Sequence, residues 1–159
     1  GRASKVEWMG MGLGEIARRV LRGTRASEHV YHYTSHAGLE GIRLRCRIQP
    51  SRRFTSHGPG VYLTDLAPAP DRLAISTALW NRWNYVGMQA YVRVLYDPDD
   101  MEQVAEHIWI VRDAPLFVAG HDIVLGEWTG AHFEDERDVG DWTAEPFTGC
   151  NPPPDELLS

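Results

Sequence analysis

Two short strings carry the side chains best suited to chemistry in this chain. The run Val30–Thr34 places His32 among β-prone residues, and the run Gly58–Asp65 places Tyr62 directly after a glycine-flexed turn. An imidazole both donates and accepts hydrogen bonds near neutral pH, and a phenol offers a broad aromatic face. We expect the two side chains to lie at the mouth of one cleft, an arrangement that suits a bound nucleotide.

The residues around these strings resemble the ADP-ribosyltransferase superfamily, and more closely its HYD1-signature toxin branch. His32–Thr34 leads into a helix-like Gly38–Ile42 and then into Ile48–Ser51, as in the first motif of that branch. Gly58–Pro68 is similar to its second motif and to that of the poly(ADP-ribose) polymerases. The resemblance covers roughly residues 28–128, and the order and spacing of the two motifs make it specific.

The resemblance implies an α+β fold in which a split pair of mostly antiparallel sheets clamps NAD, with flanking helices. It implies that His32 holds the adenosine ribose through its hydroxyls. It further implies that the backbone of Tyr33 hydrogen-bonds the nicotinamide carboxamide and that Tyr62 stacks on the nicotinamide ring. Thr34, Gly60 and other residues of the two motifs complete the expected NAD site.

A basic loop lies between the two motifs. Ser51 opens it, and we expect Arg52 or Arg53 to bind the NAD pyrophosphate and Phe54 to line the nicotinamide side. The alternative for this loop is a solvated basic turn without a ligand.

Cleavage of the nicotinamide–ribose bond also needs an acid, because the ribose develops positive charge that a carboxylate stabilises. Such a hydrogen bond contributes about 1.5–3 kcal/mol, so losing it should slow the reaction by at least tens of fold. Glu106, which precedes the apolar run 107–111, is our first choice. The alternatives are Asp122, which also precedes a strand-like run, and the turn acids Asp97, Asp99 and Asp100.

We therefore expect an enzyme that cleaves NAD and transfers ADP-ribose to a protein or nucleic acid, as a toxin or effector domain. An NAD glycohydrolase is the first alternative, and transfer to a small molecule such as a rifamycin-type antibiotic is another. From a different class comes a non-catalytic module that binds NAD, ADP-ribose or a protein. A toxin would also imply a cognate inhibitor protein.

Composition narrows the function classes. The chain has 159 residues and a net charge of −6, which argues against a general nucleic-acid binder. Residues 1–60 carry a net charge of +7 and residues 61–159 a net charge of −13. The sequence contains no phosphate-binding loop, dinucleotide fingerprint, nucleophile elbow or paired-histidine metal motif. His29, His32 and His36 recur closely but fall on different faces, so we expect no metal.

Cys46 and Cys150 lie far apart in the sequence and share no metal-ligand spacing with histidines. We interpret them first as two unrelated free thiols. The alternative is one disulfide that ties the tail back to the domain.

The periodicity of apolar residues predicts four helices, over 15–22, over 37–44 with Ser35 as its N-cap, over 71–83 and over 101–105. The predicted strands cover 28–34, 48–51, 61–64, 89–96, 107–111, 115–118 and 122–128. Because this order lacks regular βαβ alternation, it favours antiparallel sheets that pack face to face.

We divide the chain into a lead-in with a helix (1–27), an ADP-ribosyltransferase-like domain (28–129) and an acidic, Pro-ended tail (130–159) that extends from the domain or packs on it. Since the chain begins at Gly1 without methionine, we expect a piece of a longer protein. No apolar run is long enough to span a membrane or to resemble a signal peptide. The toxin resemblance implies a soluble chain that is secreted or delivered within a larger toxin.

Overall fold

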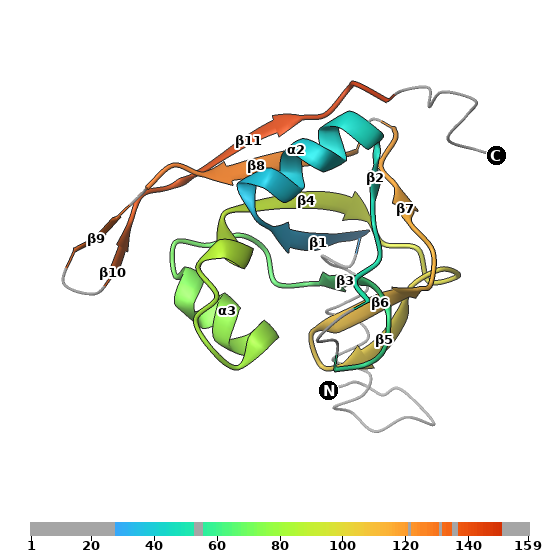
Figure 1. Ribbon diagram of the computed structural model, residues 1–159, viewed down its shortest axis with the longest axis horizontal. Helices are drawn as coiled ribbons and strands as arrows, with labels where there is room; N and C mark the ends of the chain where they lie inside the picture. Colours follow the sequence, from blue (N-terminus) through green and yellow to red (C-terminus); the bar gives the residue numbers. More distant parts are fainter. Residues whose placement is uncertain (1–27, 53–55, 121, 131, 135–136, 151–159) are drawn as a thin grey trace, which may run out of the picture.

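A seven-stranded antiparallel sheet forms the framework of the protein. The computed structural model describes residues 28–52, 56–120, 122–130, 132–134 and 137–150. The strand order is β11-β8-β4-β1-β3-β6-β5 (Figure 1). In chain order these strands are β1 (His29–Thr34), β3 (Gly60–Thr64), β4 (Ala90–Leu95), β5 (Glu102–Ala105), β6 (Ile108–Arg112), β8 (Val124–Trp128) and β11 (Trp142–Pro146).

Two short two-stranded sheets accompany the main sheet in the described residues. They join β2 (Arg47–Ile48) to β7 (Leu116–Phe117) and β9 (His132–Glu134) to β10 (Arg137–Val139). All described pairs are antiparallel, which confirms the expected α+β class with antiparallel sheets. The expected pair of sheets packed face to face is not observed, because the main strands form one continuous sheet. All seven predicted strands have counterparts, within a few residues at each end.

Helix α2 (His36–Arg45) confirms the prediction over 37–44. The Ser35 hydroxyl accepts a hydrogen bond from the Gly38 N–H at 2.9 Å, the N-cap that the sequence predicts. Helix α3 (Arg72–Trp80) begins at an Asp71 cap but ends three residues before the predicted Trp83. The helix ends there because Asn81 adopts a left-handed backbone conformation (φ 57°), which asparagine adopts more readily than most residues other than glycine. One turn of 3-10 helix, η2 (Val86–Met88), follows.

The predicted helix over 101–105 is wrong. Glu102–Ala105 is instead strand β5, which pairs with β6 at the edge of the sheet. Five residues cannot form a stable helix without tertiary support, whereas the hairpin supplies a pairing partner six residues away. The Asp97–Asp100 turn that precedes β5 is closed by the Met101 N–H, which donates to the Asp97 carbonyl at 2.9 Å.

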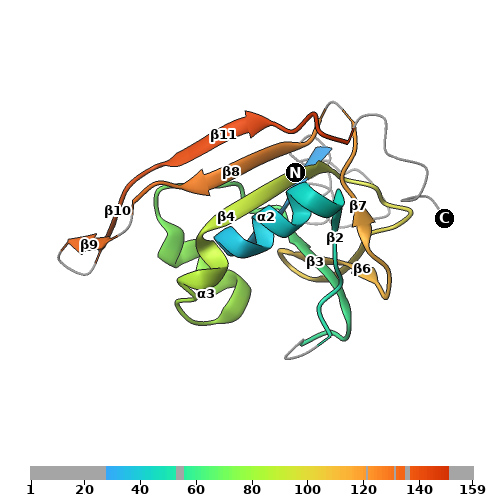
Figure 2. The same ribbon diagram turned by 45° about the horizontal axis from the view of Figure 1, so that its top comes forward.

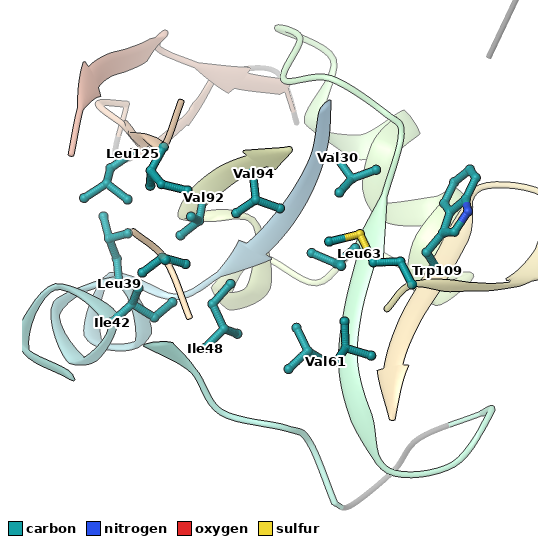
Figure 3. Close-up of a cluster of buried hydrophobic side chains, with 14 of the residues drawn as sticks. Val30, Leu39, Ile42, Ile48, Val61, Leu63, Val92, Val94, Trp109 and Leu125 are labelled. Atoms are coloured by element: carbon teal, nitrogen blue, oxygen red, sulfur yellow. The ribbon is translucent and has the colours of Figure 1, made fainter. Parts of the chain in front are cut away.

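The two helices cover opposite faces of the sheet. Residues of α2 pack with alternate residues of β1, β4, β3 and β8 in the main core (Figure 3); among them are Val30, Leu39, Ile42, Ile48, Val61, Leu63, Val92, Val94 and Leu125. The intervening residues of β1 and β4 face α3 in a second cluster, which contains Tyr33, Ile75, Met88 and Tyr91. The period-two alternation of β1 and β4 therefore serves two cores at once.

Strand β11 shows that part of the acidic tail belongs to the main sheet. It pairs with β8 over five residues and forms the sheet's edge, while the β9–β10 hairpin projects beyond it (Figure 2). The Trp142 indole N–H donates to the Ala69 carbonyl at 2.9 Å and so ties this edge to the segment before α3. Of the expected tail, Trp142–Pro146 pack on the domain as a strand of the main sheet.

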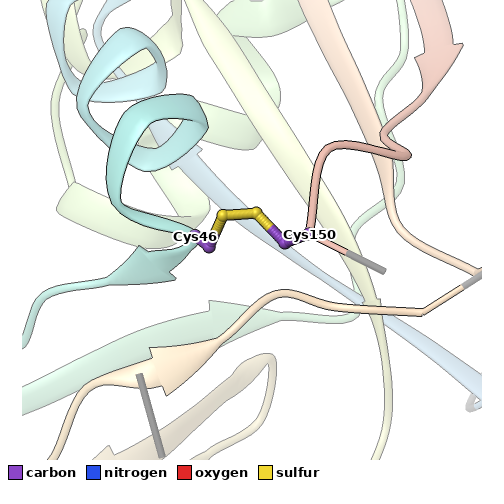
Figure 4. The surroundings of a disulfide bond; sticks show 2 residues. All are labelled: Cys46 and Cys150. Carbon is purple, nitrogen blue, oxygen red and sulfur yellow. A yellow bond between two sulfur atoms is a disulfide. The ribbon is translucent and has the colours of Figure 1, made fainter. Parts of the chain in front are cut away.

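The interpretation of the cysteines as free thiols is wrong, because Cys46 and Cys150 form a disulfide (Figure 4). Cys46 ends α2, and Cys150 follows β11, at a Cα–Cα distance of 6.0 Å. The alternative, one disulfide that ties the tail back to the domain, is confirmed; sequence spacing could not decide between the two, since the Cys150 segment approaches α2 only after β11 has joined the sheet.

Several expectations concern residues outside the described part of the chain. These are the helix over 15–22, the rest of the lead-in 1–27, Arg53, Phe54 and residues 151–159. Within the described ranges, no helix has both the length and the apolar character needed to cross a membrane.

The disulfide closes a loop of 104 residues, so its loss should destabilise the protein substantially. Removing a cross-link over a loop of this size costs about 2–5 kcal/mol. We expect the double variant Cys46→Ala/Cys150→Ala to unfold at a clearly lower urea concentration than the oxidised wild type. Reductant should bring the wild type to the midpoint of the variant and leave the variant unchanged. Equal midpoints for oxidised wild type and variant would contradict this prediction.

Candidate functional site

The main sheet is open at one place, between β1 and β3. These strands share a single register pair, Tyr31 with Thr64, whereas β1 pairs with β4 at six positions and β3 with β6 at five. Beside this pair, the His32 Nδ1 lies 2.9 Å from the Tyr62 carbonyl oxygen. A side chain thus takes a backbone acceptor that an ordinary ladder would use. The sheet is continuous, but its least paired junction separates β11-β8-β4-β1 from β3-β6-β5.

The hydrogen bond fixes the chemistry of His32. A carbonyl oxygen only accepts, so Nδ1 carries the proton and donates. In the neutral ring, Nε2 is then the acceptor. Burial lowers the pKa of His32 below its ordinary value and outweighs the opposing effect of the Tyr62 carbonyl. His32 is therefore a neutral imidazole near pH 7, with one nitrogen committed to the fold and one suited to a ligand hydroxyl.

Tyr62 is held by its hydroxyl and presents its ring. The hydroxyl donates to the Gly58 carbonyl at 2.6 Å and accepts from the His57 N–H at 2.9 Å. These bonds pin the end of the loop that precedes β3. Arg112 strengthens the same turn, because its guanidinium donates to the His57 carbonyl and, at 3.2 Å, to Glu102. Since the hydroxyl is engaged in both directions, the aromatic face is what Tyr62 offers to a ligand.

A cleft of about 310 Å³ lies at the opening of the sheet. It is bounded by β1, β3, the loop before β3, the end of α3 and the start of β6. The lining residues are Tyr31, His32, Tyr33, Ser51, Ser56, His57, Tyr62, Leu63, Thr64, Leu79, Trp80, Arg82 and Ile108. Aromatic rings with a few polar groups are typical of a small-molecule site, and the volume is at the lower end of the usual range.

The structure brings His32, Tyr33, Ser51 and Tyr62 together at this cleft, as the sequence predicts. The Tyr33 side chain is buried, and its hydroxyl donates to the Leu66 carbonyl at 2.8 Å. Burial raises the pKa of Tyr33 far above its ordinary value, so its phenol stays neutral. Only its backbone and ring surface are left for a ligand.

Thr34 and Gly60 support the cleft without lining it. A Cβ on Gly38 would lie 2.1 Å from the Thr34 Oγ1, so Thr34 packs closely on the first turn of α2. Gly60 exchanges two backbone hydrogen bonds with Ser51, at 2.8 and 2.9 Å. A Cβ on Gly60 would lie 2.5 Å from the Val111 carbonyl oxygen, which explains why glycine is needed there. Both residues therefore position cleft residues and do not contact the cleft themselves.

The structure does not place the expected acids in the cleft. Glu106 lies in the β5–β6 turn with its side chain 82% exposed, two residues before the lining residue Ile108. Asp97, Asp99 and Asp100 lie in the β4–β5 turn, along a separate surface groove with Glu102 and Arg112. Asp122 is exposed before β8. Among the described residues that line the cleft there is no carboxylate.

Another acid, Asp65, is adjacent in the sequence to a residue that lines the cleft. Asp65 follows the lining residue Thr64 and lies 2.9 Å from the His107 Nδ1. Its side chain is 22% exposed, far less than that of Glu106. The Asp65–His107 pair joins the ends of β3 and β6 at the rim of the cleft.

Sequence reasoning missed Tyr31, His57, Trp80 and Arg82 as cleft residues. Tyr31 and His57 stand next to the two motifs, so adjacency was an available signal. Arg82 had none, because the predicted helix ran past it to residue 83. Arg52 is exposed and does not line the cleft, and Arg53 and Phe54 are outside the described residues.

No group of three or more metal-ligating side chains occurs within the described ranges. A scan against protein-family models and searches of curated proteins and of solved structures found no match to this chain. The function therefore has to be argued from the geometry of the cleft.

The lowered pKa of His32 predicts a pH-dependent stability. The unfolded His32 takes up a proton as the pH falls through about 6.5, whereas the folded residue resists it. The stabilisation is complete above that pH and is lost as the pH falls toward the lower, folded pKa. We expect His32→Gln to reduce the loss of unfolding free energy between about pH 7 and 5. His29→Gln, on the same strand, should keep the wild-type dependence; an equal effect of both variants would contradict the assignment.

Proposed function

We propose that this protein binds NAD in the cleft between β1 and β3, breaks the nicotinamide–ribose bond and transfers ADP-ribose to a macromolecular acceptor. The observation that carries the proposal is His32 in the opening of the sheet, with Nδ1 donating to Tyr62 and Nε2 left as an acceptor. A ribose hydroxyl is a matching donor. The sparse pairing between β1 and β3 supports the proposal, since the motif resemblance implies that NAD lies between the strands that carry the two motifs.

The aromatic rings that line the cleft suit the nicotinamide end of NAD. Tyr31 and Tyr62 belong to the two strands that diverge, and both line the cleft. The nicotinamide ring of NAD is cationic, and a cation over an aromatic face is attracted by about 0.5–2 kcal/mol. Pairing between β1 and β3 ends at Tyr31, so the backbone of Tyr33 lies beyond the last register pair. We assign to the Tyr33 backbone the hydrogen bonds to the nicotinamide carboxamide.

In the proposed reaction, the C1′–N bond of NAD breaks and nicotinamide leaves as a neutral base with the bonding electron pair. The ribose carbon, now oxocarbenium-like, is attacked by an acceptor nucleophile that loses its proton. With water as the acceptor, the same steps release free ADP-ribose, which is the glycohydrolase alternative. A carboxylate near the ribose would stabilise the developing charge.

A second candidate function is a non-catalytic NAD or ADP-ribose module. The absence of a carboxylate from the described lining residues favours it, because binding alone needs no acid. The two candidates share the binding site and differ only in turnover, so experiments can separate them directly.

Ligand binding tests the site shared by both candidates. We expect His32→Ala and Tyr62→Ala each to weaken NAD binding by about tenfold in isothermal titration calorimetry, through one lost hydrogen bond and one lost ring contact. Tyr62→Phe keeps the ring and should bind within about threefold of the wild type. His29→Ala is the matched histidine control and should bind normally. Wild-type affinity in His32→Ala would contradict the site.

Turnover tests the acid. If Glu106 reaches the ribose when NAD is bound, Glu106→Gln should lower nicotinamide release at least tenfold while the dissociation constant for NAD stays unchanged. Asp65→Asn is the comparison variant, since that carboxylate borders the cleft from β3. Full activity in Glu106→Gln excludes its assigned role. NAD binding by the wild type without any nicotinamide release would establish the non-catalytic module.

Mass spectrometry of the products separates transfer from hydrolysis. The wild type is incubated with NAD, with and without host lysate. Modified protein or nucleic acid supports ADP-ribosyl transfer, and free ADP-ribose as the sole product supports the glycohydrolase.

A further inference from the structure

We propose that Arg82 forms the anion subsite of the cleft and holds the pyrophosphate of a dinucleotide. This inference rests on the proposed function for the identity of the ligand. It differs from the expected role of Arg52 or Arg53: Arg52 is exposed and is not among the residues that line the cleft, and Arg53 lies outside the described residues. Arg82 is the cationic side chain of fixed charge among the described residues that line the cleft.

The backbone of Arg82 is held rigidly. Ser76, which is fully buried in α3, donates its hydroxyl to the Arg82 carbonyl at 2.7 Å and accepts from the Asn84 N–H at 2.7 Å. Asn81 ends the helix in a left-handed conformation, so the chain reverses direction just before Arg82. A residue fixed in this way presents its side chain to the cleft with little loss of backbone entropy on binding.

The guanidinium of Arg82 is lightly engaged. Its Nη1 lies 3.4 Å from the Trp83 carbonyl oxygen, a long contact that leaves most of its donors for a ligand. Within the described part of the chain, no carboxylate lies within ion-pair distance of Arg82. By contrast, Arg43 and Arg112 are both paired with glutamates.

The rest of the lining matches an anion. Ser51, Ser56 and His57 share the cleft with Arg82, and no carboxylate accompanies them among the described lining residues. The whole chain carries a net charge of −6, whereas the described residues that line the cleft include an arginine and no acidic side chain. Guanidinium groups bind phosphate oxygens through two parallel hydrogen bonds, which suits a pyrophosphate.

Three ligands distinguish the subsite from the rest of the cleft. They are NAD, ADP-ribose, which has the pyrophosphate without nicotinamide, and nicotinamide riboside, which has no phosphate. In calorimetric titrations we expect Arg82→Gln to weaken NAD and ADP-ribose by about tenfold or more and to leave nicotinamide riboside unchanged. Arg82→Lys should recover part of the affinity, since it keeps the charge but loses the paired donors.

Arg52→Gln is the matched control and should bind all three ligands as the wild type does. The melting temperature of each variant shows that it is folded. Unchanged NAD binding in Arg82→Gln, or weaker binding in Arg52→Gln instead, overturns the inference while the proposed function stands. Binding of ADP-ribose but neither NAD nor nicotinamide riboside by the wild type overturns the proposed function while the anion subsite stands. Binding of none of the three overturns both.

Discussion

The hydrogen bond from His32 to the Tyr62 carbonyl is the interaction on which the site depends. It occupies a backbone acceptor at the boundary between β1 and β3, where the sheet has one register pair and not a full ladder. The side-chain hydrogen bond thus links β1 to β3 at a junction with little backbone pairing, whereas β1 pairs with β4 at six positions and β3 with β6 at five. The cleft lies at this opening, and aromatic rings from both strands, Tyr31 and Tyr62, line it.

The half of the sheet that carries β1 is stiffened by aromatic packing around a buried arginine. Arg72 is 1% exposed, and its guanidinium carbon lies 4.1 Å from the centre of the Trp128 ring. The Trp142 ring packs edge-on against Trp128 and Tyr91 at centroid distances of 5.2 and 5.3 Å. Strand β11 and α3 are thus joined through one cluster, and the turn that bears Arg82 is anchored to the same helix. The position of Arg82 therefore depends on Trp142 in an edge strand, sixty residues away in the sequence.

Local chemistry predicted most of the elements, and long-range pairing decided the rest. The Ser35 cap and the alternation of β4 were readable because neighbouring residues determine them. Strand β5 was mistaken for a helix because its partner β6, and not its own propensity, fixes its conformation. The place of β11 was unreadable for the same reason, and the Cys46–Cys150 disulfide was the second of the two interpretations that the sequence left open. In the site, His32 and Tyr62 stand in local motifs, whereas Arg82 enters the cleft only through the left-handed turn at Asn81.

The charge of the cleft imposes a further constraint on any catalysis. Two like charges about 6 Å apart repel by roughly 3 kcal/mol at an effective dielectric constant near 20, which is about a hundredfold in affinity. A carboxylate fixed in the cleft beside the phosphates of NAD would weaken binding by that order. The described lining avoids this repulsion by containing a guanidinium and imidazoles without an acid. If the proposed cleavage takes place, its carboxylate has to come from outside the described lining, and Asp65 and Glu106 both lie within ion-pair distance of His107. Under the proposed function, the cleft lining would bind the dinucleotide, and the acid would be supplied either by Asp65 after β3 or by Glu106 in the turn between β5 and β6.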